Sequence, residues 1–439
     1  MKLVIVESPK KCETIGHYLG SDYKVMASQG HIRDLSTKGK GGLGIDVEHG
    51  FAPDFVVSPN KKTIVSELKS ASRKADEVIL ATDPDREGEA ISWHLAQVLG
   101  LDVEKTKRLQ FHEITQPAIL EAIKNPSHID MNLVNSQETR RMYDRIIGFK
   151  LASLLQKKMS SKSAGRVQSV TLKMICDNDQ EIKDFKPEEY WTIDAVITLD
   201  GNEIKVSLDK VDGKTAKISN EAEAKAVLAR IGKEMLVDSV VSQAKSVPSK
   251  LPFTTSTMQQ EAYNRYKFST SRTQSIAQHL YEGETINGEH VGLITYMRTD
   301  STRISKDFYE NHAKPFILET YGEEYLGSIK FAKKSELVQD AHEAIRPTGT
   351  HRTPELVARY VDVDEAKLYR LIYERALASL MSDKKEMQTT ALFETNGLTF
   401  KATGVRTLFK GFEIVYGEFD DDDTALLPEI KEKTAYQIK

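Results

Sequence analysis

Three carboxylates stand close together in the sequence, directly after a short apolar run. Residues 77–81 have the composition of a buried strand, and Asp83, Asp85 and Glu87 follow at alternate positions. Two carboxylates about 4 Å apart repel by roughly 4 kcal/mol at an effective dielectric constant of about 20, so the group requires a cation, a shared proton or full solvation. A few oxygen ligands suit Mg²⁺. The alternative interpretation is a solvated acidic turn, which the triplet alone does not exclude.

A fourth carboxylate follows another apolar run, at the start of the chain. Residues 1–6 also have the composition of a buried strand, and Glu7 comes directly after them. Short apolar strands and amphipathic helices alternate from about residue 15 to 130, with helices beginning near residues 64 and 90. In an open α/β sheet, ligands bind at the carboxyl edge of the strands. The pattern therefore predicts that Glu7 joins the three carboxylates at one edge of such a sheet.

Length and composition exclude several classes of protein. The chain has 439 residues, of which 39% are apolar and 29% charged, so it is long enough for several domains. We expect no membrane span, which needs roughly 18 apolar residues, and no signal peptide. Cys12 and Cys176 offer neither a disulfide framework nor a zinc motif, which favours a reducing cytoplasm. With a net charge of −4, nucleic-acid binding would need a local basic surface.

Nucleotide-binding motifs are weak or absent. Residues 39–44 match the spacing G-x-G-x-x-G, but no strand enters the motif and no helix follows it, so we expect a loop there. A Walker A sequence is missing, which argues against an ATP-driven motor. The sequence therefore predicts no nucleotide cofactor.

A basic segment follows the α/β region. Between residues 140 and 173 the one acid is Asp144, and leucines and isoleucines at helical spacing give the helices a face to bury. A charge run usually marks a solvated face, but this one has a single sign in an acidic chain, so we favour a surface that follows nucleic-acid phosphates. Residues 163–169 add small residues, which permit close backbone approach, and polar side chains. The basic residues are Arg140, Arg141, Arg145, Lys150, Lys157, Lys158, Lys162, Arg166 and Lys173.

Tyr296 stands two residues before Arg298, after an apolar, strand-like run. A phenol with a pKa of about 10 is a poor nucleophile. A neighbouring guanidinium favours the phenolate and neutralises charge that develops on an attacked phosphate. A surface contact between the two side chains is the alternative. His342 and Arg346 stand one helical turn apart and could face a common phosphate, although a lone histidine is more often structural.

Two further segments have the texture of strands and suggest no chemistry. Strand patterns occur at 190–197 and 203–208, and a helix begins at Asn220, whose side chain is expected to cap it. Strand patterns return at 388–393 and 398–402, and the chain then passes an acidic loop and stops in a strand-like, charged segment. We expect these segments to form a spacer or hinge.

In their order, these motifs resemble bacterial DNA topoisomerase I, a family of type IA topoisomerases that contains a toprim domain. The resemblance covers essentially the whole chain, and the opening residues favour topoisomerase I over topoisomerase III. It rests on the stretches VIVESPKK, ASQGHIRDL, ILATDPDREGEAISWHL, RRMYDRIIGFKLASLL, SAGRVQSV, PFTTSTMQQEA, GLITYMRTDS and AHEAIRPT.

The resemblance implies a multidomain α/β and α+β fold, arranged as a torus around a hole large enough for duplex DNA. The chain would leave and re-enter its domains. The implied domains are a toprim domain (1–127), a helical DNA-binding domain (128–187), a β-rich hinge domain (188–252), a tyrosine-bearing domain (253–384), a return through the hinge domain (385–416) and the start of a return to the DNA-binding domain (417–439).

The resemblance also implies roles for individual residues. Tyr296 would attack a single-strand phosphate, take the 5′-phosphoryl end and leave a free 3′-hydroxyl, while Arg298 would stabilise the attacked phosphate. Glu7 and Lys10 would serve the leaving 3′-oxygen, and Asp83 would also support acid–base work. The implied Mg²⁺ ligands are Glu7, Asp83, Asp85 and Glu87. The implied DNA contacts are Arg141, Arg145, Ser163, Gly165, Arg166, Gln168 and Arg346, and His342 would be a catalytic, phosphate-binding residue.

The implied function is ATP-independent relaxation of negatively supercoiled DNA by a cytoplasmic, nucleoid-associated monomer that binds single-stranded DNA and no membrane. A toprim primase or nuclease would share the acids but would give no role to Tyr296. A non-catalytic single-strand binder would be expected to have lost Glu7 or Tyr296. Because the family usually continues beyond residue 439, we expect this chain to cleave DNA but to relax plasmid poorly.

Overall fold

The computed structural model describes residues 1–159, 163–199, 201–329, 343–417 and 427–439. The chain divides into two compact units, each built from three segments. The first unit comprises Met1–Ile182, Pro252–Phe308 and Phe331–Ala376, and the second comprises Lys183–Leu251, Tyr309–Lys330 and Leu377–Lys439. Among the described residues, no helix combines the length and the hydropathy that crossing a membrane requires.

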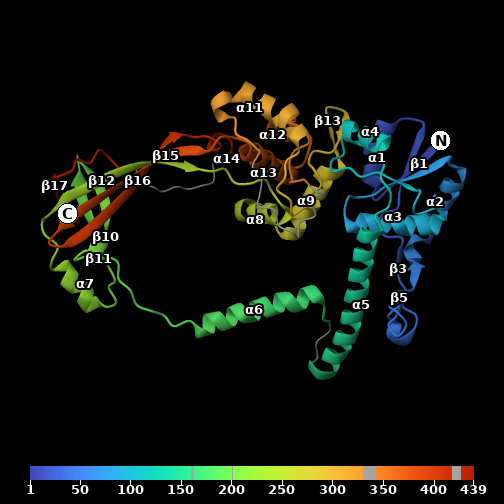
Figure 1. The fold of residues 1–439 in the computed structure, drawn as a ribbon, viewed down its shortest axis with the longest axis horizontal. Coiled ribbons are helices and arrows are strands. Elements are labelled where there is room, and N and C mark those ends of the chain that lie inside the picture. Colours follow the sequence, from blue (N-terminus) through green and yellow to red (C-terminus); the bar gives the residue numbers. More distant parts are fainter. Residues whose placement is uncertain (160–162, 200, 330–342, 418–426) are drawn as a thin grey trace. The chain divides into compact units, whose positions relative to one another are not determined.

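The first unit contains a four-stranded sheet with the order β2-β1-β7-β8. Figure 1 labels one of its strands, β1, close to the N-terminus. All three strand pairs are parallel, and the register of the two central strands places Val6 opposite Ala81. Glu7 and the acidic turn therefore leave the sheet at the same edge, as the sequence predicts. The strands are β1 (Lys2–Val6), β2 (Tyr23–Ala27), β7 (Glu77–Ala81) and β8 (Lys107–Arg108).

Helices pack against this sheet over an apolar core. Leu3, Ile5, Leu80, Ile91 and Leu95 are all at most 1% exposed, and burying each such side chain contributes about 1.5–3 kcal/mol. The helices are α1 (Pro9–Leu19), α2 (Lys62–Lys74), α3 (Arg86–Leu99) and α4 (Gln116–Lys124). The short elements are β3 (Arg33–Leu35), η1 (Lys40–Gly42), β4 (Ile45–Asp46), β5 (Ala52–Pro53), β6 (Phe55–Val57) and η2 (Pro59–Lys61).

The basic segment forms two helices, α5 (Met131–Met159) and α6 (Arg166–Asp184). Their apolar residues are less buried than the helical spacing led us to expect. Ile146 packs against a small cluster around Leu35, but Leu154 is 53% exposed, and α6 buries none of its residues. Within the described residues, these helices therefore lack much of the packing that their sequence is suited to make.

The tyrosine lies in an irregular segment that follows α8 (Thr255–Tyr266), α9 (Thr270–Glu282) and a hairpin of β13 (Glu284–Ile286) and β14 (Glu289–Val291). Residues 292–301 form isolated backbone hydrogen bonds and one β-bridge, between Ile294 and Pro347. The strand-like run expected there therefore does not form a regular strand. The remaining helices of this part are α10 (Lys306–Phe308), α12 (Pro354–Val357) and α13 (Val363–Ser379).

The expectation that His342 and Arg346 share a helical turn is wrong for the described part of that segment. Residues 343–348 contain no helix, and Ile345 and Pro347 each form a β-bridge with a distant residue. The physical reason is Pro347, because a proline disfavours the helical conformation of the residue before it, here Arg346. His342 lies outside the described residues.

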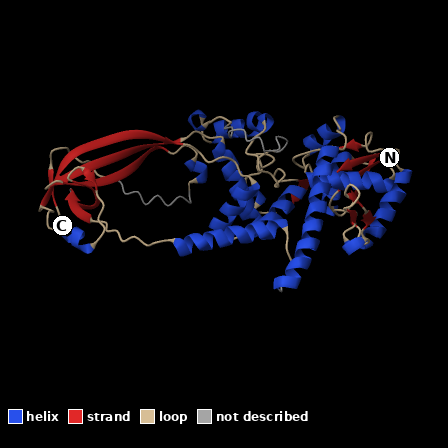
Figure 2. Ribbon diagram, turned by 60° about the horizontal axis from the view of Figure 1, so that its bottom comes forward, coloured by secondary structure: helices blue, strands red, loops and turns tan. Residues whose placement is uncertain are grey.

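The second unit is built on a seven-stranded sheet with long antiparallel strands (Figure 2). Strands appear where the sequence predicts them, and Asn220 caps α7 by accepting a hydrogen bond from the backbone N–H of Glu223. The strands are β9 (Asp194–Leu199), β10 (Asn202–Val211), β11 (Lys214–Thr215), β12 (Glu234–Val247), β15 (Lys384–Thr395), β16 (Leu398–Phe409) and β17 (Ala435–Gln437). The helices are α7 (Glu221–Leu228), η3 (Tyr309–Ala313), α11 (Lys314–Thr320), η4 (Glu323–Tyr325) and α14 (Glu413–Tyr416).

The end of the chain differs from the domain assignment that we expected for residues 417–439. Instead of starting a return to the DNA-binding helices, residues 435–437 form β17, which pairs antiparallel with β12. The pairing places Tyr436 opposite Met235, and both pack in the apolar core of the sheet. Packing of Tyr436 in this core explains why this part of an otherwise charged segment forms a strand.

Candidate active site

The acidic turn between β7 and α3 has a defined geometry. Asp85 is the N-cap of α3, and its Oδ1 accepts a 2.8 Å hydrogen bond from the backbone N–H of Gly88. A Cβ on Gly88 would lie 2.2 Å from the carbonyl oxygen of Asp83, so only glycine fits this position. The turn thus places Asp85 and Glu87 at the N-terminus of α3, where the helix dipole has its positive end.

Arg108 supports this turn from inside the protein, and sequence reasoning missed it. Its side chain is fully buried and forms an ion pair with Glu89, which is also fully buried. The Arg108 guanidinium also donates to the carbonyl oxygens of Thr82 at 2.9 Å and Asp83 at 2.7 Å. The signal available in the sequence was an arginine at the end of a short strand, directly before the buried Leu109.

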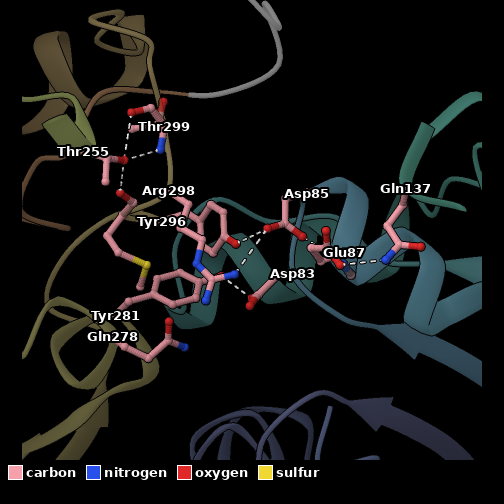
Figure 3. Close-up of polar contacts among 12 residues, drawn as sticks. Asp83, Asp85, Glu87, Gln137, Thr255, Gln278, Tyr281, Tyr296, Arg298 and Thr299 are labelled. Carbon is pink, nitrogen blue, oxygen red and sulfur yellow. Dashed lines mark hydrogen bonds and ion pairs between the residues drawn. The ribbon is translucent and has the colours of Figure 1, made fainter. Parts of the chain in front are cut away.

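Tyr296 reaches the acidic turn from the other side of the site. Its hydroxyl donates a 2.6 Å hydrogen bond to Asp85 Oδ2 (Figure 3). Its backbone N–H donates to the carbonyl of His112. Burial, together with the charges of Asp83 and Asp85, raises the pKa of the Tyr296 phenol far above its usual value. The Arg298 guanidinium lies 3.8 Å from the same Asp85 oxygen. The structure therefore brings together four of the residues that the sequence singled out.

Glu7 and Asp83 form a tightly coupled pair. Burial and the neighbouring Asp83 charge raise the pKa of Glu7 to about 8. Burial also opposes ionisation of Asp83, but the Lys11 ammonium, the hydrogen bond with Glu7 and the Arg298 charge together outweigh it and lower the pKa of Asp83 below its usual value. Lys11 is completely buried and forms an ion pair with Asp83 Oδ1. At neutral pH the pair therefore holds one proton, mainly on Glu7.

Lys11, not Lys10, is the lysine that faces the acids. Lys10 Nζ lies 2.5 Å from Glu284 Oε1, which belongs to the β13–β14 hairpin. Adjacent residues of a helix point about 100° apart, so α1 can present only one of the two lysines to the sheet edge. The expected role of Lys10 at the leaving oxygen therefore finds no support in the geometry, whereas Lys11 is correctly placed for such a role.

Glu87 does not join the other acids in this structure. Its Oε2 accepts a 2.9 Å hydrogen bond from Gln137 Nε2 on α5 and lies 3.3 Å from His31 Nε2. The hydrogen bond from His31 is the main cause that lowers the pKa of Glu87 to about 2. Glu87 is thus ionised and held towards α5.

The remaining acids fit a magnesium ion by their chemistry. Within the described residues, no three His, Cys, Asp or Glu side chains converge on one point. However, Glu7 and Asp83 hold a shared proton against mutual repulsion, and a divalent cation would relieve that repulsion in the same way. Glu7, Asp83 and Asp85 offer only oxygen donors, as Mg²⁺ prefers. Glu87 would have to leave Gln137 to take part.

Apart from Arg346, the residues expected to contact DNA lie on α5, on α6 and in the loop before α6, and three of them are paired with acids. Arg141 donates to both carboxylate oxygens of Asp34, at 3.0 and 2.6 Å, and Arg145 lies 3.7 Å from the same group. Arg166 forms a similar two-point ion pair with Asp144. At the start of α6, Ser163 donates to Gln168 at 3.4 Å, and the Gly165 carbonyl accepts from the N–H of Ser169.

Arg346 is placed differently from the other expected DNA contacts. It is 4% exposed and forms ion pairs with Glu113 at 2.8 Å and Glu343 at 2.7 Å. Its guanidinium also packs over the ring of Phe308, 4.5 Å from the centroid. In this structure Arg346 therefore joins parts of the first unit and faces no open surface.

Comparison with known protein families finds two matches that together cover most of the chain. Residues 2–114 match the toprim domain, and residues 128–439 match the DNA topoisomerase family. This chain belongs to the DNA topoisomerase family. The prediction drawn from the sequence motifs is thereby confirmed, as is a mixed α/β, multidomain fold with a toprim domain.

Two similar topoisomerases extend this result along the chain. DNA topoisomerase 1 of Campylobacter jejuni is 44% identical over 434 residues, which are 98% of this chain and 61% of that protein. The solved structure of full-length topoisomerase I from Thermotoga maritima matches with a TM-score of 0.86 at 39% identity, covering 100% of this chain and 71% of that one. The chain thus spans less than two thirds of the Campylobacter relative.

Proposed function

We propose that this topoisomerase changes DNA topology by cutting one DNA strand through a covalent bond to Tyr296 and then rejoining it. The observation that carries the proposal is the 2.6 Å hydrogen bond from the Tyr296 hydroxyl to Asp85, opposite Glu7 and the buried Asp83 and Lys11. A nucleophile with an acceptor for its proton thus faces a group that holds a transferable proton. This is the arrangement that general acid–base catalysis requires.

The cleavage step transfers one proton at each end of the broken bond. The Tyr296 oxygen attacks phosphorus and forms the phosphotyrosine bond, while its proton passes to Asp85 Oδ2. The bond from phosphorus to the 3′-oxygen breaks, and the leaving oxygen takes the proton that Glu7 holds below about pH 8. Rejoining is the reverse of these transfers. One phosphodiester replaces another, so the bond energy is kept and no ATP is needed.

Two cations of the chain would stabilise charge during this step. Arg298 lies beside the Tyr296 hydroxyl and would neutralise charge on the attacked phosphate. Lys11 keeps Asp83 ionised and so keeps the shared proton on Glu7. Once Glu7 has given its proton to the leaving oxygen, a Mg²⁺ ion held by Glu7, Asp83 and Asp85, with Glu87 once released, would supply positive charge for the DNA ends.

The whole reaction would be the relaxation of negatively supercoiled DNA. We propose that the protein works as a monomer at the cytoplasmic nucleoid, with α5 and α6 holding the single strand. We also propose that residues 1–439 by themselves cleave more readily than they relax, because strand passage needs a firm grip on both ends and α6 buries none of its residues. Plasmid relaxation and oligonucleotide cleavage by the same preparation test this last point.

The central proposal is tested with end-labelled single-stranded DNA. A mixture stopped with detergent should contain protein attached to the 5′ end of cleaved strands, and Tyr296→Phe should abolish the adduct. Because this substitution removes one hydroxyl, the affinity for single-stranded DNA should stay within about twofold of the unmodified protein. Adducts of equal yield in the phenylalanine variant would place the nucleophile elsewhere.

A further inference from the structure

A second tyrosine is buried beside Tyr296. Tyr281, near the end of α9, has no exposed surface, and its ring meets the Tyr296 ring edge-on, with centroids 5.2 Å apart and planes at 65° (Figure 3). Its hydroxyl donates to Asp83 Oδ1 at 3.4 Å, and Lys11 Nζ lies 5.2 Å from the centroid of its ring. One side chain thus touches the nucleophile, the buried carboxylate and the buried ammonium.

The presence of a tyrosine at this position requires an explanation beyond packing. A phenylalanine would fill the same space without taking a hydroxyl out of water, which is costly unless the hydroxyl finds a partner. Here the hydroxyl points to Asp83, and the same carboxylate oxygen receives the Lys11 ammonium. Two donors on one oxygen fix the direction of the Asp83 carboxylate, which is the partner of Glu7.

Tyr281 is also tied to the backbone that carries the nucleophile. The N–H of Leu293 donates to the carbonyl of Leu280 at 2.7 Å, and a Cβ on Gly292 would lie 2.7 Å from the Tyr281 carbonyl oxygen. The end of α9 and the segment that leads to Tyr296 are therefore packed as one piece. Asp83 and Lys11, in contrast, belong to the sheet edge and to α1.

We infer that Tyr281 is a positioning residue for DNA cleavage, which sets the ring of Tyr296 relative to the Asp83–Lys11 pair. The inference rests on the proposed function. The ring restrains the direction in which the Tyr296 oxygen points, and the hydroxyl links the nucleophile segment to Asp83, the partner of Glu7. A misplacement of about 1 Å can cost about a hundredfold in rate, so a restraint of this kind matters for the chemistry more than for binding.

The test separates the ring from the hydroxyl with two variants of the full chain. Single-turnover adduct formation on labelled single-stranded DNA should be about tenfold slower in Tyr281→Phe, which loses the hydrogen bond to a charged group. It should be about a hundredfold slower in Tyr281→Leu, which loses the ring as well. The dissociation constant for the same DNA should stay within about twofold in both.

A matched control removes another buried hydroxyl. Tyr369 is also fully buried, and its hydroxyl donates to the carbonyl of Arg352 at 2.6 Å, so Tyr369→Phe should keep the cleavage rate within about twofold. Circular dichroism shows whether each variant folds. If the leucine variant does not fold, the comparison of Tyr281→Phe with the unmodified protein and Tyr369→Phe decides the question.

Several outcomes would overturn the inference. Cleavage by both Tyr281 variants at the unmodified rate would leave the residue no positioning role, and so would a loss of DNA affinity as large as the loss of rate. A phenylalanine variant no faster than the leucine variant would remove the role of the ring. The proposed function fails separately, because an unmodified protein that forms no adduct would refute it before any variant is compared.

Discussion

The hydroxyl of Tyr296 and the carboxylate of Asp85 lie 2.6 Å apart, and the same carboxylate caps helix α3 with its other oxygen. One side chain therefore fixes the helix that follows the acidic turn and accepts the hydrogen bond of the proposed nucleophile. In the absence of DNA, burial and the acids keep the Tyr296 phenol protonated, because they raise its pKa. In the proposed mechanism, Tyr296 is thus kept in an unreactive form until a phosphate reaches the site.

The first prediction concerns Asp85. Asp85→Asn should preserve the fold, because asparagine is an equally good N-cap, and should slow adduct formation by about 10²–10⁴, the usual contribution of a general base. The rate is measured in a single turnover, with and without added Mg²⁺. Loss of rate at every Mg²⁺ concentration would support proton transfer, whereas full recovery in excess Mg²⁺ would assign Asp85 to the metal alone.

The second prediction contrasts two adjacent lysines. Lys11→Met removes the partner of a buried carboxylate, so it should lower the free energy of unfolding by about 3–5 kcal/mol and strongly reduce cleavage. Lys10→Met breaks a partly exposed ion pair with Glu284 and should change stability by at most about 1 kcal/mol. Urea unfolding and adduct yield are measured for both. A Lys10 variant as damaged as the Lys11 variant would contradict the assignment.

The third prediction concerns pH and Glu7. The raised pKa of Glu7, about 8, means that its proton is available to the leaving oxygen below about pH 8 and is lost above it. Single-turnover cleavage should therefore fall about tenfold per pH unit above that value. Glu7→Gln should be slow throughout and lack this alkaline limb. An unchanged limb in the glutamine variant would assign the titration to another group.

The raised pKa of Glu7 also makes the stability of the fold depend on pH. Because the folded protein binds the Glu7 proton more tightly than the unfolded chain, Glu7 stabilises the fold below the unfolded value of about 4.5, and this contribution is lost as the pH rises through about 8. Unfolding curves at pH 6 and pH 9 should therefore differ less in Glu7→Gln than in the unmodified protein.

The sequence predicted that Glu7 and the acidic turn meet at one edge of a sheet, because the carboxyl ends of parallel strands lie at the same edge. Residue types predicted the strands before Glu7 and Asp83. The resemblance to a known family suggested Tyr296 as the nucleophile that would meet these acids. The choice between Lys10 and Lys11 was not, because it depends on the rotation of α1 against the sheet. Sequence also could not show that Glu87 turns towards α5, since that depends on a contact with Gln137.

Other differences arise from long-range packing. Pro347 was visible in the sequence and could have excluded the helical turn at Arg346, but the ion pair of Arg346 with Glu113 joins positions that are 233 residues apart. Likewise, the sequence indicates a strand near residue 439, but it does not show that β17 pairs with β12. Local patterns do not contain that information.

The fourth prediction concerns His94, a buried residue whose Nδ1 accepts a 3.0 Å hydrogen bond from Arg33 Nε. Burial and the Arg33 charge lower the pKa of His94 to about 3, so the unfolded chain binds a proton that the folded protein does not bind between about pH 6.5 and 3. Stability should fall on acidification by about 1.4 kcal/mol per pH unit from this group. His94→Gln keeps an acceptor and should show a shallower fall; an unchanged slope would contradict the prediction.

The last prediction concerns the grip on DNA by Arg141 and Arg166. In the structure these arginines are held by Asp34 and Asp144, so a phosphate must displace a carboxylate from each. The Arg141–Asp34 pair is 44% exposed on both sides, and such pairs contribute at most about 1 kcal/mol. Asp34→Asn should therefore tighten single-strand binding by up to about fivefold, because the competing charge is gone.

Charge reversal of both arginines should do the opposite and should also change the salt dependence. Each phosphate neutralised contributes about −0.7 to the slope of log affinity against log salt, so Arg141→Glu with Arg166→Glu should flatten the slope by about 1.4. A control with Lys105→Glu and Lys225→Glu changes the net charge equally at exposed ion pairs outside the basic helices, and its slope should be unchanged. Fluorescence anisotropy with labelled single strands from low to high salt provides the measurement. Equal flattening in both double variants would mean that bulk charge, not these two arginines, attracts the DNA.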